Sequence, residues 1–233
     1  MVGTLTIGLL AWILIAERRS WMKKLGWVAL GWVITVGLLG GLTVKLLTPP
    51  PVSILHTCMA QLFFSLTIAM VVFTSRSWHQ GPRIVEDQGW PSLRSLAILT
   101  PAAVLTQIAL GAGFRQRALS AWPHLIGAMV ISLIILITAV CVLTQFADHR
   151  PLRAAARTLI AVTGVQVFLG LLALTALTRT VPRETEILVS TVAHVVTGAL
   201  TLAASIVLAI QIRRNVRTHA SEAADAPHAA VTP

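Results

Sequence analysis

Long runs of apolar residues, separated by short polar or charged stretches, organise this chain. Seven runs stand out, and they cover residues 2–17, 25–47, 53–75, 93–114, 121–146, 154–178 and 186–212. A helix needs about 20 apolar residues to cross a bilayer, and every run except the first reaches that length. The pattern predicts an all-α integral membrane protein of about seven transmembrane helices.

The composition agrees with a membrane protein and argues against nucleic acid as a partner. Hydrophobic residues make up 56% of the chain and charged residues 11%, and the mean hydropathy is +0.82. The net charge is +10, but the basic residues lie in short clusters between apolar runs, where they act as topology signals. Cys58 and Cys141 lie inside apolar runs toward opposite ends of their helices, so we expect buried free thiols.

The basic clusters also predict an orientation in the membrane. They fall in alternate loops, at residues 18–24, 76–94 and 150–157, and after the last run at 213–217. The positive-inside rule places these segments and the C-terminus in the cytoplasm and the N-terminus outside. No cleavable signal peptide precedes the first run, and a further helix upstream would remove the difficulty of exporting this end. The polar tail, residues 216–233, is expected to be disordered and cytoplasmic.

Three histidines lie within the apolar runs, and the predicted orientation puts all three near the outer ends of their helices. Ionisable residues inside a membrane span usually have a partner. Each of these histidines has a small residue three or four positions later on the same helix face, which leaves room for a flat cofactor or merely permits close helix packing. The pairs are His56 with Ala60, His124 with Gly127 and Ala128, and His194 with Gly198.

Haem suits this arrangement better than zinc or a proton pathway. Zinc sites need three or four close ligands, and proton pathways usually contain acidic residues at depth. The eight carboxylates lie in loops, helix ends and the tail. Paired histidines on facing helices are typical of bis-imidazole haem. Four arginines at the outer edge either pair with haem propionates or anchor the chain at the interface: Arg115, Arg117, Arg179 and Arg183.

A weak internal repeat divides the chain. The segment VGLLGGLTV (36–44) resembles QVFLGLLAL (166–174), with Gly40 aligned to Gly170, and each is followed by a Pro-containing loop and a histidine. Extended backwards, the repeat pairs the fifth run with the first, and the position equivalent to His124 falls just before Met1. We therefore expect three helices in residues 1–92 and four in 93–215, the remnant of two pseudo-symmetric four-helix bundles.

The sequence resembles haem A synthase, the membrane enzyme that converts haem O to haem A for cytochrome oxidase. Three segments carry the resemblance, which extends to about residue 214: GGLTVKLLTPPPVSILHTCMAQLFFSLTIAM (40–70), GAGFRQRALSAWPHLIGA (111–128) and TVAHVVTGALTL (191–202). The first segment is the most specific of the three. The others are Gly/Ala-rich, and such helices are easily matched.

The resemblance implies an eight-helix fold with a histidine pair in each bundle. His124 and His194 match the pair that holds haem b, with Arg115 as a further cofactor-binding residue, and His56 matches an axial ligand of the substrate haem. The reaction oxidises a methyl group of haem O to the formyl group of haem A, and haem b relays the electrons. The implied partners are membrane lipid, haem O, and haem O synthase or oxidase-assembly proteins in a bacterial plasma membrane, with homo-oligomerisation left open.

The sequence departs from the family at its N-terminal end. The family's Glu-x-x-His-Arg stretch and an outer-loop cysteine pair would lie upstream of Met1. Two alternatives therefore remain open. One is a non-catalytic b-type membrane cytochrome or oxidase-assembly factor, which needs only His124 and His194. The other is a transporter or scaffold whose histidines form hydrogen bonds between helices and bind no haem.

Overall fold

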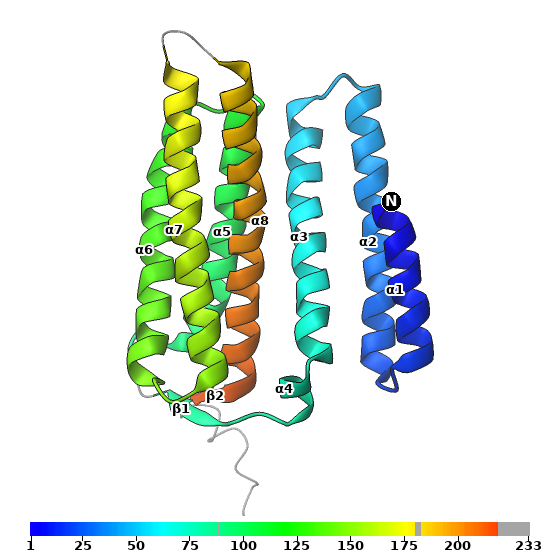
Figure 1. Cartoon of the computed structure of the whole chain (residues 1–233), viewed down its shortest axis with the longest axis vertical. Helices are drawn as coiled ribbons and strands as arrows, with labels where there is room; N and C mark the ends of the chain where they lie inside the picture. The colour runs from blue at the N-terminus through cyan, green and yellow to red at the C-terminus, as the bar shows by residue number, and fades with distance from the viewer. Residues whose placement is uncertain (88, 180–182, 219–233) are drawn as a thin grey trace, which may run out of the picture.

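The computed structural model describes residues 1–87, 89–179 and 183–218, and helices dominate it (Figure 1). Six helices are long and apolar enough to cross a membrane. The prediction of an all-α, multi-pass membrane protein is therefore confirmed. These six helices are α2 (Ser20–Lys45), α3 (Pro50–Thr74), α5 (Leu93–Arg115), α6 (Ala121–Gln145), α7 (Arg150–Thr178) and α8 (Glu184–Asn215).

The first apolar run forms a helix that is shorter than a full span. Helix α1 (Val2–Ala16) has 15 residues, which at 1.5 Å per residue is about 22 Å, against about 30 Å of bilayer hydrocarbon. Four other helices begin two to five residues before their apolar runs, and the two longest extensions are those of α2, from Ser20, and α7, from Arg150. Arginine and lysine are good helix formers, so basic residues extend these helices beyond the apolar segment.

Helices α5 to α8 form a four-helix bundle in which each helix packs on its two neighbours. Helix α6 packs on α5 and α7, and α8 packs on α7 and α5, so α6 and α8 occupy diagonal corners. Buried leucine, isoleucine, valine and alanine side chains from all four helices fill the interior. Close packing of such side chains, rather than exclusion of water, holds helices together in lipid.

The N-terminal half is an open row of three helices. Helix α1 packs on α2, α2 packs on α3, and α3 also packs on α8 and α5 of the bundle (Figure 1). A separate core of Ile13, Met22, Ala29, Phe63 and Met70 joins the three helices. Helix α3 therefore connects the two halves of the molecule. Both cysteines are free, as predicted, but they are half-buried rather than buried.

The linker between the halves contains structure that the sequence did not predict. It forms the short helix α4 (Arg76–His79) and the strand β1 (Val85–Asp87), which pairs in parallel with β2 (Val216–Thr218). The expectation that the tail is disordered from residue 216 is wrong for these three residues, because strand pairing satisfies their backbone groups. Residues 219–233 lie outside the described part. We call the end of the molecule that carries β1 and β2 the strand end.

His149, which sequence analysis left without a role, is a structural residue at the strand end. Its side chain is only 7% exposed. Its Nε2 donates to the carbonyl oxygen of Arg83 over 3.0 Å, and its Nδ1 accepts a hydrogen bond from the backbone N–H of Leu152. His149 therefore caps the first turn of α7 and fixes the linker against it.

An ion pair closes the turn between α1 and α2 and reaches α3. Arg19 binds the carboxylate of Glu17 and donates from Nη1 to the carbonyl oxygen of Phe73 over 3.0 Å. The hydrogen bonds from the Arg19 side chain and backbone lower the pKa of Glu17 to about 2. Protonation of Glu17 would therefore release Arg19 only in strong acid.

We expect Glu17→Gln to destabilise the N-terminal half modestly, by up to about 1 kcal/mol at neutral pH, because the pair is only partly shielded from water. The folded carboxyl has a depressed pKa, so its contribution is present above about pH 4.5 and disappears as the pH falls toward 2. Thermal unfolding of both proteins in detergent, measured between pH 7 and pH 3, should give a difference that shrinks with acidification. A difference independent of pH would contradict this role for Glu17.

Candidate functional site

All three membrane histidines lie at one end of the molecule, opposite the strand end. Helices α3, α6 and α8 begin at this end (Figure 1), and His56, His124 and His194 lie within their first three turns. The three histidines therefore lie toward the same end of the molecule. We call this end the histidine end.

His124 and His194 face each other across the four-helix bundle. Their ring centroids are 6.2 Å apart and their planes are nearly perpendicular, at 88°. Because α6 and α8 are diagonal helices, the two imidazoles meet near the bundle axis. A histidine nitrogen binds a metal at about 2 Å, so two imidazoles on opposite sides of one metal ion have centroids about 6 Å apart. The observed separation fits two axial ligands of one iron.

Each membrane histidine lies against a glycine of the helix that precedes its own. A Cβ atom built on Gly40, Gly111 or Gly170 would lie 3.1, 2.8 or 2.9 Å from Cε1 of His56, His124 or His194, respectively. Real Cβ atoms rarely approach so closely, so any other residue would push the imidazole away. The three glycines therefore fix where the three rings lie.

His56 and His194 share a second contact. Nδ1 of His56 donates to the carbonyl oxygen of Val36 over 3.1 Å, and Nδ1 of His194 donates to that of Gln166 over 3.2 Å. In both cases the acceptor lies four residues before the glycine that faces the ring, as the aligned segments 36–44 and 166–174 predict. A backbone acceptor on Nδ1 leaves the lone pair on Nε2, the usual form of a metal-binding histidine.

His124 differs, because its partner is a side chain. Nε2 of Gln107 lies 3.1 Å from Nδ1 of His124 and also donates over 2.7 Å to the backbone carbonyl oxygen of His124. The 2.7 Å contact identifies this atom as the amide nitrogen of Gln107, because the amide oxygen would be repelled by the backbone carbonyl oxygen of His124. The contacts of Gln107 and Gln166 with the histidines were not predicted from the sequence, although each glutamine lies four residues before a glycine that faces a histidine.

The small residues that follow the histidines in sequence make room for glutamine side chains, and not for a cofactor as we expected. Gly127 lies against the side chain of Gln107, and a Cβ on Gly198 would lie 3.3 Å from Nε2 of Gln166. The space beside these two glycines is therefore occupied by glutamine side chains. The expectation that it accommodates a flat macrocycle is not met by the described arrangement.

Three of the four arginines of the histidine end have side-chain partners among the described residues, and Arg117 has none there. Nη2 of Arg115, at the end of α5, donates over 3.2 Å to the hydroxyl of Thr57, the neighbour of His56. Arg179 and Arg183 both pair with Glu186. Arg115 thus lies between the helix that carries His56 and the four-helix bundle, whereas Arg179 and Arg183 close the loop before α8.

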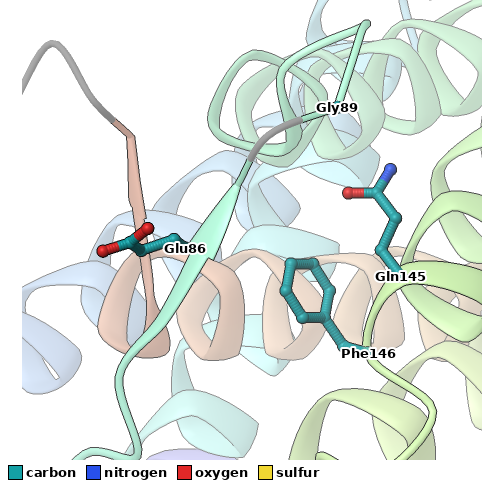
Figure 2. Close-up of a pocket in the computed structure, with 4 residues that line it drawn as sticks. All are labelled: Glu86, Gly89, Gln145 and Phe146. Carbon is teal, nitrogen blue, oxygen red and sulfur yellow. The ribbon is translucent and has the colours of Figure 1, made fainter.

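A cavity of about 400 Å³ lies at the strand end, far from the histidines, and is lined by Glu86, Gly89, Gln145 and Phe146 (Figure 2). Gln145 ends α6, whereas His124 lies in the first turn of the same helix. In Figure 2 the carboxylate of Glu86 points away from Gln145 and Phe146. The cavity therefore offers no convergent set of polar groups.

No family model, curated protein or solved structure matches this chain. Function must therefore be argued from the site itself. Within the described residues, no group of three or more histidine, cysteine and carboxylate side chains is placed to hold a metal ion. The chemically competent arrangement is the pair of neutral nitrogen ligands, His124 and His194, and this donor set fits a bis-histidine haem.

Proposed function

We propose that this chain is a haem-binding membrane oxidoreductase of the haem A synthase type. In this proposal His124 and His194 hold haem b, and His56 is an axial ligand of the substrate haem. The observation that carries the proposal is the pair of imidazoles on diagonal helices, 6.2 Å apart between ring centroids. That arrangement needs two separate helices to place histidines at one depth with glycines opposite them, which chance helix packing rarely supplies.

The chain's own residues would orient the ligands. The carbonyl oxygen of Gln166 holds the proton of His194 on Nδ1 and fixes the ring plane, and Val36 does the same for His56. Such outer partners raise the basicity of a histidine ligand. Arg115 would supply positive charge to a haem propionate and, through Thr57, lies close to the His56 site.

Haem b, when bound, supplies a one-electron redox centre. The proposed reaction oxidises a methyl group of haem O to the formyl group of haem A. It would take its oxygen atom from water and release four electrons and four protons, and the electrons would leave one at a time through haem b to an acceptor outside this chain. The basic loops support an orientation in which the strand end and the C-terminus are in the cytoplasm of a bacterial cell and the histidine end faces outward. Haem O is then the substrate, and haem O synthase or oxidase-assembly proteins are the partners that would supply it or receive the product.

A second candidate function is that of a non-catalytic b-type cytochrome or assembly factor. The N-terminal half favours it, because His56 is the one histidine that the described membrane-spanning helices of this half carry. A substrate haem there would meet one histidine ligand from those helices. The two candidates make the same prediction for haem b and opposite predictions for turnover.

The distinguishing experiment combines His56→Ala with a reduced-minus-oxidised optical spectrum and a haem O conversion assay. We expect about one low-spin haem b per chain in both proteins, with conversion of haem O by the unchanged chain and none by His56→Ala. Haem b without conversion in either protein would favour the cytochrome. A chain that stays colourless when expressed with ample haem would leave the histidines with a structural role, as in a transporter or scaffold.

A further inference from the structure

The side-chain amides of Gln107 and Gln166 form hydrogen bonds with the two imidazoles that would bind iron. Gln107 donates to Nδ1 of His124, so the ring proton of His124 must lie on Nε2. His194 carries its proton on Nδ1, which donates to the Gln166 carbonyl oxygen, so its Nε2 is an acceptor. That Nε2 lies 3.4 Å from Nε2 of the Gln166 amide, which is the donor in this contact.

Both contacts exclude an iron bond to the same imidazole. Nε2 of His124 carries the ring proton, so it has no lone pair to give to a metal. Nε2 of His194 has a lone pair, but while this lone pair accepts the hydrogen bond from Gln166 it is not available to a metal either. The two imidazole rings therefore have a separation suited to iron, but the hydrogen bonds that they form with the glutamines compete with iron binding.

The glutamine side chains are placed to enter and leave this state. Each packs against a glycine on the histidine's own helix, Gly127 or Gly198, which leaves space for the amide. Each also has a buried Oε1 without a hydrogen-bond partner among the described residues. An amide with an unpaired buried oxygen is held less firmly than a fully bonded one, because part of its hydrogen-bonding capacity is unused.

We infer that Gln107 and Gln166 form a gate on the histidine pair, which holds the two imidazoles through hydrogen bonds and must be displaced when haem enters. This inference rests on the proposed haem site between His124 and His194. It adds that haem affinity at this site is set by competition with two amides. At His56 the position equivalent to Gln166 is Val36, whose side chain has no polar group, so the His56 site has no such competitor from this position.

The test is a titration of purified, haem-free full-length chain with ferric haem b, followed by the Soret absorbance. Gln107→Leu and Gln166→Leu each remove one competing hydrogen bond, so each should lower the Kd for haem about fivefold. Each should also lower the Tm of the haem-free chain while leaving that of the haem-loaded chain unchanged. Methionine variants at the two positions, which keep the length of the side chain, replace the leucine variants if those do not fold.

Gln61→Leu is the matched control, because Gln61 is a buried glutamine of α3 with an unpaired Oε1 and no described hydrogen bond to a histidine. It should change both Tm values equally and leave the Kd unchanged. Binding by the unchanged chain with an equal or higher Kd in both glutamine variants would overturn the gate and leave the haem site intact. Absence of haem binding by the unchanged chain would overturn the gate and the haem site together.

Discussion

Replacing His194 by alanine should reduce the haem b content of the purified chain from about one per chain to almost none. The imidazole of His194 lies 6.2 Å from that of His124 between centroids, and its Nδ1 is fixed by a backbone carbonyl. Alanine removes one of the two proposed haem ligands and leaves the other without a partner across the bundle. A pyridine haemochrome measurement, normalised to protein, gives the haem-to-protein ratio directly.

The control for this variant is His79→Ala, because His79 is exposed in α4 at the strand end. It should keep the full haem content, and His124→Ala should behave like His194→Ala. If the haem-to-protein ratio survives in His194→Ala, then His194 is not a ligand and the proposed function loses its main support.

Gly170→Ala should reduce haem binding almost as strongly, although glycine supplies no ligand atom. A Cβ at this position would lie 2.9 Å from Cε1 and 3.3 Å from Nδ1 of His194. The ring would have to move by several tenths of an ångström, which would weaken its bond to the Gln166 carbonyl and shift its Nε2 away from the bundle axis. We expect at least a tenfold higher Kd for haem, or about 1.4 kcal/mol, measured by haem titration.

The same helix supplies a matched control. Gly164 also lies in α7, but a Cβ built there meets no atom within 4 Å. Gly164→Ala should therefore leave the Kd unchanged and keep or slightly raise the Tm, because alanine favours the helix over glycine. Equal effects of the two substitutions would mean that helix propensity, rather than contact with His194, explains the result.

The sequence was sufficient to predict the membrane-spanning helices and the end of the molecule at which the three histidines lie, because both depend on local patterns. Apolar runs have the length of a bilayer span, and basic loops order them, so the first turns of α3, α6 and α8 were expected at one end. The alignment of Gly40 with Gly170 also predicted a real equivalence, since both glycines face a histidine and both segments supply a carbonyl to its Nδ1.

The remaining features depend on contacts between residues far apart in the chain. Gln107 and Gln166 are ordinary polar residues in apolar runs, and only the packing of α5 on α6 and of α7 on α8 brings their amides to the imidazoles. His149 looked like a loop residue because its acceptor, the Arg83 carbonyl, lies 66 positions earlier. The strands β1 and β2 have three residues each, too few to give a period-2 pattern.

The pairing of β1 with β2 has a consequence for the order in which the protein is made. The linker emerges from the ribosome well before residues 216–218, so its strand partner does not exist until all the membrane helices have been synthesised. The hydrogen bonds of Asn215 to the Arg83 N–H and of Arg94 to the Val216 carbonyl are equally late. The two halves can thus enter the bilayer and adjust to each other first, and the linker becomes fixed only after α8 has been made.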